Sequence, residues 1–264
     1  MSTRLQAVFA REHPAFVAYI MGGDPDLDAS QALMNAMPAA GVDIIELGFP
    51  FTDPMADGPT IEEAGIRARK AGASLRSVLG MAETFREADS DTPIIVMGYA
   101  NPVYQMGYGT FAEAAYRAGV DGAIIVDLPP EEDAELRAAM DSHGLSLIRL
   151  ATPTTDAERL PIVVSGSSGF VYYVSMTGVT GGQLGSSGSV AAQVERIRAA
   201  TDVPVVVGFG VKTPERAAEI AQAADGVVVG SAIVKAMHEG GPEATLNLIR
   251  SLADAVHNVG TEPT

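Results

Sequence analysis

Three carboxylates stand close together in the stretch ELGFPFTDPMADGPT, residues 46–60. Glu46 lies near the end of an apolar segment, whereas Asp53 and Asp57 follow among prolines and glycines that disfavour both helix and strand. Burial raises the pKa of a glutamate, and a carboxyl group with a pKa of roughly 6–7 can both donate and accept protons at neutral pH. Glu46 is therefore our first candidate for acid–base catalysis, with Asp57 as a second carboxylate beside it.

Each of these acids also has an ordinary structural interpretation. Glu46 could pair with an arginine from another element, and Asp57 precedes a glycine, as aspartates commonly do in turns. Asp53 precedes a proline and lies further from the next helix, so its case is weaker. Asp127 ends another apolar segment, where it could face inward like Glu46 or cap the helix that follows two prolines.

Other catalytic groups are missing or poorly placed. The chain has no cysteine, which excludes disulfides and thiolate zinc sites. Its histidines show no metal-ligand spacing, so we expect no metal site and no metal-dependent aldolase or hydrolase. The histidines are His13, His143, His238 and His257. Among the lysines only Lys212 is a candidate for a Schiff base, and it lies beyond an apolar segment instead of within one.

Eight short apolar segments, most of them β-branched or aromatic, recur along the chain, and Ala-rich amphipathic stretches separate them. The segments are residues 16–22, 42–48, 93–99, 122–128, 145–151, 169–175, 204–210 and 226–232. Near-continuous apolar strands are typical of parallel sheets buried on both faces. The alternation predicts an α/β fold, a single (βα)8 TIM barrel over residues 1–264, with an extra N-terminal helix and a short helix after the eighth strand. An open doubly wound sheet is the alternative, but no G-x-G-x-x-G follows the first segment.

Local signals predict several helix boundaries. Thr60 and Thr213 are expected to cap the starts of helices, because acidic residues follow each of them within one turn. Gly119 and Gly144 lie where C-terminal caps belong. Pro161 lies inside the connection after the fifth segment, so we expect that connection to be short and broken.

In a (βα)8 barrel the active site lies at the carboxyl ends of the strands and on the loops that follow them. Alternation along a strand places Glu46 on the same face as Ile44 and Gly48, opposite Ile45 and Leu47. If the first face points inward, Glu46 projects into the mouth of the barrel.

Glycines at the ends of the seventh and eighth segments predict a phosphate site. The seventh segment ends at Gly210, and Gly230 and Ser231 precede a short helical stretch. Barrels often bind phosphate with these two loops and a helix N-terminus, although such glycines can also serve only in tight turns. The glycine-rich segment 177–189 could close over a substrate as a lid, or it could be a plain linker.

The net charge of −16, from 17 basic and 33 acidic residues, argues against nucleic-acid binding. A small phosphorylated ligand remains compatible, because backbone N–H groups can bind phosphate without basic side chains. The first residues lack a continuous apolar run, and no segment approaches the roughly 18 apolar residues of a membrane span. We therefore expect a soluble cytoplasmic protein whose acidity serves solubility, without nucleic-acid or membrane partners.

Four motifs together resemble the tryptophan synthase alpha subunit family: ELGFPFTDPMADGPTI, FVYYVSMTGVTG, VGFGVKTPE and VVGSAIVK. They occur in the family's order, and the resemblance covers essentially the whole chain. It implies a barrel that cleaves indole-3-glycerol phosphate by a retro-aldol reaction into indole and glyceraldehyde 3-phosphate. Glu46 would be the general acid and base, and Asp57 would hydrogen-bond the indole N–H and stabilise the indolenine tautomer.

The resemblance also implies roles for the residues around these two acids. The pocket for the indole and glycerol parts would be lined by Tyr19, Ile61, Tyr99, Asp127, Tyr172 and Phe209. The phosphate would be held by Gly181, Gly210, Gly230 and Ser231. Thr180 would contact Asp57 when the lid closes, and Asp53 and Pro54 would face a partner subunit.

That partner would be the tryptophan synthase beta subunit, in an alpha2beta2 heterotetramer. Pyridoxal phosphate is expected only in the beta subunit, and this chain would need no cofactor of its own. Met176 stands where family members commonly have arginine, so lid closure and its coupling to the partner can differ. The alternatives are another phosphate-binding barrel, such as a phosphoribosyl isomerase or indole-glycerol-phosphate synthase, and a subunit that only activates a beta partner.

Overall fold

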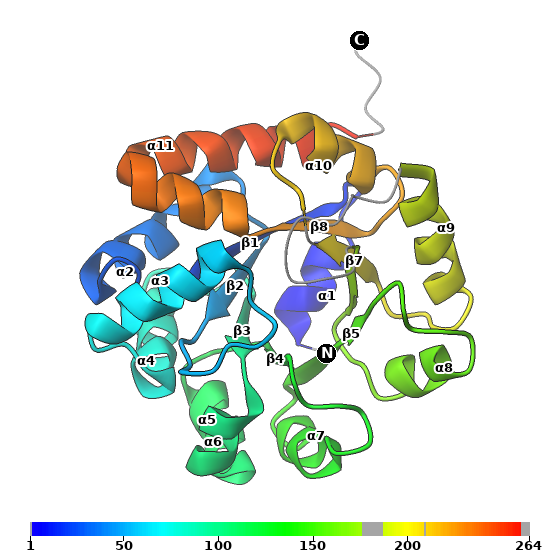
Figure 1. Ribbon diagram of the computed structural model, residues 1–264, viewed down its shortest axis with the longest axis horizontal. Coiled ribbons are helices and arrows are strands. Elements are labelled where there is room, and N and C mark those ends of the chain that lie inside the picture. Colours follow the sequence, from blue (N-terminus) through cyan, green and yellow to red (C-terminus); the bar gives the residue numbers. More distant parts are fainter. Residues whose placement is uncertain (1, 176–186, 209, 260–264) are drawn as a thin grey trace.

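The computed structural model describes residues 2–175, 187–208 and 210–259, and in it eight parallel strands close into a barrel in chain order (Figure 1). The strands are β1 (Ala15–Met21), β2 (Ile44–Gly48), β3 (Ile94–Gly98), β4 (Gly122–Ile125), β5 (Ser146–Ala151), β6 (Val171–Val174), β7 (Val205–Gly208) and β8 (Gly226–Val229). Strand β1 pairs with both β2 and β8, which closes the barrel. The predicted TIM barrel is therefore confirmed, and the open sheet is excluded.

Helices surround the strands (Figure 1). They are α1 (Thr3–Phe9), α2 (Leu27–Ala36), the 3-10 helix η1 (Pro38–Ala40), α3 (Pro59–Lys70), α4 (Leu75–Arg86), α5 (Ala100–Met106), α6 (Tyr108–Arg117), α7 (Ala134–Asp141), α8 (Arg159–Val164), α9 (Ser187–Arg198), α10 (Pro214–Ala221) and α11 (Ser231–His257). Helix α1 confirms the extra N-terminal helix. The backbone of Gly241 is not helical and interrupts α11 before Pro242, so its first part is the short helix expected after the eighth strand. Helix α8 contains Pro161 and is only six residues long, in agreement with the predicted broken connection.

The helix caps agree with the sequence signals at three of four positions. Thr213 caps α10, because its side chain accepts a hydrogen bond from the Arg216 N–H. Gly119 and Gly144 follow α6 and α7 with φ of +72° and +70°, the left-handed region that favours glycine. The prediction for Thr60 is wrong: α3 begins at Pro59, with Gly58 as its N-cap. Proline suits the first helical position, so the helix starts one residue earlier.

Strand alternation produces two hydrophobic layers. Ile44 belongs to the cluster inside the barrel, to which all eight strands contribute, together with Leu5 of α1. Ile45 and Leu47 belong to the cluster between the strands and the surrounding helices. The face that carries Ile44 and Glu46 therefore points inward, as the alternation predicts.

Three aspartates repeat one arrangement at the amino ends of the strands. Each lies directly before a strand, and its carboxylate accepts a hydrogen bond of 2.7–2.9 Å from a backbone N–H at the start of the preceding strand. The pairs are Asp43 with Phe16, Asp121 with Ile94, and Asp225 with Val205. Each carboxylate also forms an ion pair with at least one arginine. The arrangement links neighbouring strands by side chains in addition to the backbone ladder.

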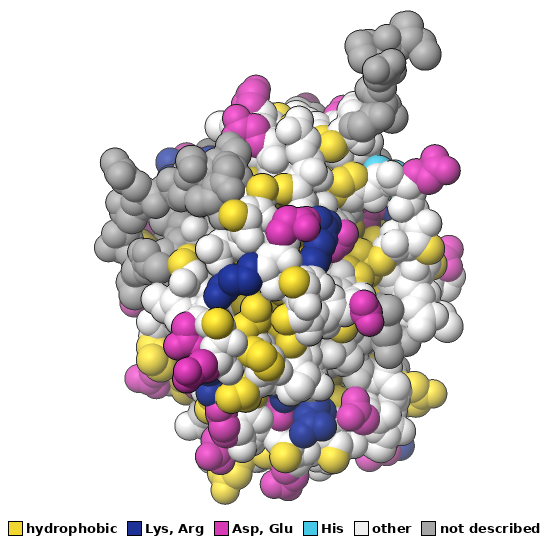
Figure 2. Space-filling view, turned by 90° about the vertical axis from the view of Figure 1, so that its right-hand side faces the viewer, with side chains coloured by type: hydrophobic (Ala, Val, Ile, Leu, Met, Phe, Trp, Pro, Cys, Tyr) yellow, Lys and Arg dark blue, Asp and Glu magenta, His cyan; other side chains and the backbone are white. Residues whose placement is uncertain are grey.

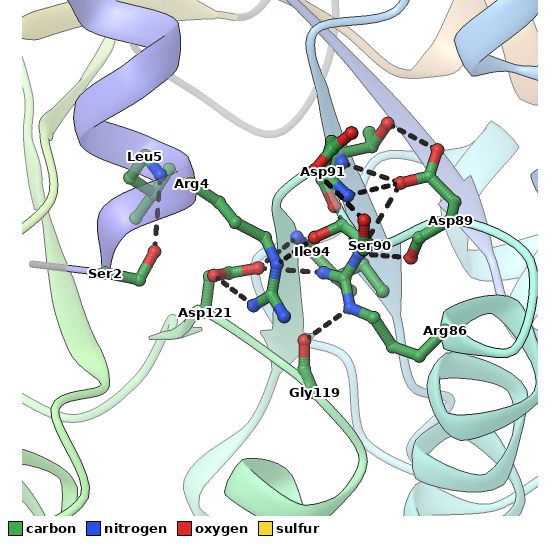
Figure 3. Close-up of polar contacts among 11 residues, drawn as sticks. Ser2, Arg4, Leu5, Arg86, Asp89, Ser90, Asp91, Ile94, Gly119 and Asp121 are labelled. Atoms are coloured by element: carbon green, nitrogen blue, oxygen red, sulfur yellow. Dashed lines mark hydrogen bonds and ion pairs between the residues drawn. The ribbon is translucent and has the colours of Figure 1, made fainter.

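Asp121 pairs with two arginines (Figure 3). It is fully buried and lies between two guanidinium groups, Arg4 from α1 at 3.0 Å and Arg86 from α4 at 2.9 Å. The Arg86 guanidinium also donates to the Gly119 and Thr92 carbonyl oxygens. Asp121 thus connects the N-terminal helix, an outer helix and two strands.

Replacing Asp121 with asparagine should lower the free energy of unfolding by about 2–4 kcal/mol, because two arginines would lose their buried counter-charge. Urea denaturation at neutral pH would measure the change through the midpoint. Glu113→Gln is the matched control, since the Glu113–Arg117 pair is exposed and should contribute less than about 1 kcal/mol. Equal effects of the two substitutions would contradict a special role for Asp121.

Candidate active site

Glu46 lies inside the barrel near the carboxyl end of β2, between Tyr19 of β1 and Ile95 of β3. Only 1% of its surface is exposed. Its Oε2 atom has no hydrogen-bond partner, and no arginine or lysine forms an ion pair with it in the described part of the chain. The alternative in which Glu46 is a structural partner of an arginine is therefore not supported by the described residues.

Burial without a compensating charge raises the pKa of Glu46 to about 8. The side chain is therefore mostly protonated at neutral pH, and a modest change in its surroundings is enough to move the proton. A carboxyl group in this condition can first donate a proton and then take one back, which is what a combined general acid and base has to do.

Asp57 lies in the loop between β2 and α3 and accepts a hydrogen bond of 2.8 Å from the Tyr99 hydroxyl. The same hydroxyl accepts a hydrogen bond from the Ala56 N–H, so Tyr99 fixes both the loop backbone and the carboxylate. Burial raises the pKa of Asp57 to about 6, although the Tyr99 hydrogen bond lowers it and the charge of Glu62 raises it further. Asp57 thus remains mostly ionised at neutral pH, in contrast to Glu46.

Tyr19 lies near both acids. Burial raises its pKa most, and the charges of Asp57 and Glu46 add to that rise. Tyr172 is also buried, and the charge of Glu46 likewise raises its pKa. The structure therefore brings the two acids together with Tyr19, Tyr99 and Tyr172, although these residues are widely separated in the sequence.

Two glycines at strand ends make room for these tyrosines. A Cβ atom at Gly48 would collide with the Tyr19 hydroxyl, and one at Gly208 would collide with the Tyr172 hydroxyl. The alternation along the strand places Gly48 on the inward face, but the sequence pattern does not require glycine at position 48 or 208. The close tyrosine rings explain why both positions are glycine, because any side chain there would collide with a tyrosine.

The described part of the predicted phosphate site is formed by Gly210, Gly230 and Ser231. Gly210 has a φ of +77° directly after β7. Gly230 is the N-cap of α11, and no side chain caps the N–H groups of its first turn, which begins at Ser231. A Cβ atom at Gly230 would lie 3.3 Å from Tyr19, so this helix start lies beside Tyr19. Gly181, Thr180, Phe209, Met176 and most of the segment 177–189 lie outside the described residues.

Asp127 does not occupy either of its predicted positions. Strand β4 ends at Ile125, and the side chain of Asp127 is exposed instead of facing inward. Its Oδ1 atom accepts a hydrogen bond of 2.7 Å from the Ala100 N–H at the start of α5, whereas the N-cap of α7 is Asp133. Asp127 therefore caps a helix from a neighbouring unit of the barrel, directly beside Tyr99.

The remaining predicted residues in the described part of the chain are Ile61, Asp53 and Pro54. Ile61, on the first turn of α3, packs against the cluster that contains Tyr19. Asp53 is exposed and accepts a hydrogen bond from the Thr52 hydroxyl, and Pro54 is half-buried. Next to them Met55 has 76% of its surface exposed.

Sequence reasoning missed one residue that supports the site and the close approach of two histidines. The ring of Phe51 stacks on Tyr99 with a centroid distance of 5.5 Å, and no periodic pattern singles out a lone aromatic residue in a loop. The histidines show no metal-ligand spacing in the sequence, yet the ring centroids of His13 and His257 are 4.3 Å apart. The barrel brings the segment before β1 and the end of α11 together at its amino face, which linear spacing cannot show.

One face of the molecular surface is shown in Figure 2. On the face seen in Figure 2 acidic, basic and hydrophobic side chains alternate over the surface, without one dominant patch. In the part of the chain that the structure describes, no helix combines the length and the apolar character that crossing a bilayer requires.

Comparisons with known proteins agree with the geometry. Residues 5–259 match the family described as tryptophan synthase alpha chain. Among solved structures, the tryptophan synthase alpha chain of Legionella pneumophila subsp. pneumophila is 38% identical, with a TM-score of 0.90 over 99% of this chain and 100% of the other. A tryptophan synthase structure from Mycobacterium tuberculosis is 41% identical, with a TM-score of 0.90 over 97% of this chain and 99% of the other. The chain belongs to the tryptophan synthase alpha chain family.

Proposed function

We propose that the chain cleaves indole-3-glycerol phosphate into indole and glyceraldehyde 3-phosphate. The observation that carries this proposal is the contrast between two carboxyl groups that both lie near Tyr19. Glu46 is buried, without an ion pair to a described residue, and has a pKa of about 8. Asp57 is held by Tyr99 and has a pKa of about 6. A reaction that needs one protonated and one ionised acid at neutral pH fits this pair.

In the proposed reaction, protonated Glu46 donates its proton to C3 of the indole ring. The ring then carries a positive charge at its N–H group, and the Asp57 carboxylate accepts a hydrogen bond from that group and stabilises the charge. The Glu46 carboxylate next removes the proton from the hydroxyl on the side-chain carbon bonded to C3. The bond between C3 and this carbon breaks, its electron pair restores the aromatic ring, and the carbon becomes the aldehyde of glyceraldehyde 3-phosphate.

The other predicted residues would position the substrate. Gly210, Gly230 and Ser231, with Gly181, would hold the phosphate, because the open N–H groups at the start of α11 favour an anion. The indole ring and the glycerol chain of the substrate would lie between Tyr19 and Tyr172. The other predicted lining residues would complete the pocket. Glu46 supplies both proton transfers, so we propose that the chain uses no cofactor.

We also propose that the chain works with a tryptophan synthase beta subunit in an alpha2beta2 assembly, and that pyridoxal phosphate belongs to that partner. The exposed loop with Asp53, Pro54 and Met55 is a candidate contact surface. Met176 stands at a position where arginine is common in the family. This difference can change how strongly the chain is coupled to the beta subunit without changing the cleavage reaction.

The test is release of indole from indole-3-glycerol phosphate by the wild-type chain, with a beta subunit present and serine absent. Indole formation would support the proposal. Folded protein that binds glycerol 3-phosphate but releases no indole would contradict it, and would favour another phosphate-binding barrel or a subunit that only activates its partner.

The pH dependence of kcat/KM should be bell-shaped, with limbs near pH 6 and pH 8. Activity should fall below about pH 6 as Asp57 becomes protonated, and above about pH 8 as Glu46 loses the proton that it has to donate. The phosphate of the substrate also titrates near about pH 6, so the residual activity of Asp57→Asn serves as the control. If the fall of kcat/KM at low pH is unchanged in Asp57→Asn, it belongs to the titration of the substrate phosphate and not to Asp57.

A further inference from the structure

A second cluster of side chains lies at the amino end of the barrel, opposite the carboxyl ends that carry the candidate active site. His13 precedes β1, Asp43 precedes β2, and His257 is the last residue of α11. One potential ligand atom from each of the three residues lies within 4.8 Å of the other two. The His257 Nε2 atom is 2.7 Å from Asp43 Oδ2, and the two imidazole rings are 4.3 Å apart between centroids.

Backbone groups hold two of these side chains in place. Asp43 is buried, and its Oδ2 atom accepts a hydrogen bond of 2.8 Å from the Phe16 N–H. The Nδ1 atom of His13 lies 3.1 Å from the Pro14 carbonyl oxygen. When Nδ1 donates to that carbonyl, Nε2 keeps a free lone pair. Histidines that bind metals characteristically donate their other ring nitrogen to a carbonyl or carboxylate in this way.

We infer that His13, Asp43 and His257 form a binding site for a divalent transition metal, with Zn²⁺ as the best match. Two imidazole nitrogens and one carboxylate oxygen are an established donor set for Zn²⁺. Tetrahedral ligands at about 2.0–2.1 Å from zinc lie roughly 3.3 Å from one another. The His257–Asp43 pair has to open slightly to reach this separation, and the three ligand atoms, now within 4.8 Å of one another, have to draw together around the metal.

The site can be reached from solvent, and one positive charge competes with the metal. Arg11 and His13 line a surface cleft of about 530 Å³. The Arg11 guanidinium pairs with the other oxygen of Asp43 and reduces the negative charge that a cation meets. Because 47% of the Arg11 side chain is exposed, it can turn toward solvent when a metal binds.

A metal at this position would join three segments that lie far apart in the sequence: the chain before β1, the start of β2 and the end of α11. It would therefore act on stability instead of on the reaction at the opposite end of the barrel. A ligand that binds only the folded state raises the apparent stability, and the gain grows with the logarithm of the ratio between the free ligand concentration and the dissociation constant.

The experiment is calorimetric titration of the untagged, chelator-treated chain with Zn²⁺ at a fixed pH close to neutral. We expect one Zn²⁺ per chain and a rise in the melting temperature on zinc addition. His13→Gln and His257→Gln should each weaken binding by about tenfold or more. Glutamine at position 257 retains an N–H donor for Asp43, so loss of binding in a folded variant reports on the ligand. Co²⁺ should give the intense visible absorption of a tetrahedral site.

The chain supplies its own controls in its two other histidines. His143→Gln and His238→Gln should leave Zn²⁺ binding unchanged, because neither side chain belongs to the cluster. Arg11→Gln should tighten binding severalfold, because it removes the competing charge. Zn²⁺ binding that survives in the folded His13→Gln/His257→Gln double variant, or that is lost in either control variant, would overturn the inference.

Discussion

Replacing Glu46 with glutamine should lower the rate of indole release by about 10³-fold or more. General acid–base catalysis by one group contributes typically about 10²–10⁴-fold, and Glu46 is proposed to act in two successive proton transfers. Glutamine has nearly the same shape, but it can neither donate an acidic proton to C3 nor accept the hydroxyl proton. The measurement is the initial rate of indole formation in the presence of a beta subunit, with indole detected directly.

Binding of glycerol 3-phosphate should survive this substitution, since the residues proposed to bind phosphate lie on the loop after β7 and at the start of α11. Asp57→Asn should lower the rate by about 10²–10³-fold, because it removes a charge that stabilises the developing cation. Glu62→Gln is the matched control: Glu62 is an exposed acid near Asp57, and its loss should change the rate little. A Glu46→Gln variant that is folded and fully active would remove Glu46 from the mechanism.

The sequence predicts the barrel and the position of its first acid because both depend on local periodicity. Buried parallel strands keep an apolar pattern that survives without any knowledge of their neighbours. The same pattern overestimates the strand ends: the segment 226–232 is apolar or small throughout, yet β8 ends at Val229 and Ser231 already belongs to α11. Apolar character reports burial, whereas the ladder of hydrogen bonds decides where a strand ends.

The arrangement of the site depends on contacts between distant segments, which periodicity does not contain. Asp127 was expected to act within its own strand–helix unit, but its carboxylate caps the helix that starts at Ala100. Tyr99 holds Asp57 across 42 positions of sequence. His13 and His257 meet only because the barrel closes. In each case one residue type permits several roles, and the tertiary fold selects among them.

The burial of Glu46 should also make the stability of the protein depend on pH in a particular direction. The pKa of Glu46 is about 8 in the folded chain, against a reference value of 4.5. The folded state therefore binds a proton that the unfolded state releases between these two values. The contribution of Glu46 to stability is greatest below about pH 4.5, decreases as the pH rises toward 8, and levels off above it.

Glu46→Gln should consequently be more stable than the wild type at pH 8 and above, by about 2–4 kcal/mol, and nearly equal to it at pH 5. Urea denaturation at both pH values would measure this difference. The titration of Asp57 is common to both proteins and cancels. A variant that is less stable than the wild type at pH 8 would mean that the Glu46 anion has a stabilising partner in the fold. The same residue would then lose the feature from which its catalytic role is argued, because a compensated carboxylate has no reason to hold a proton at neutral pH.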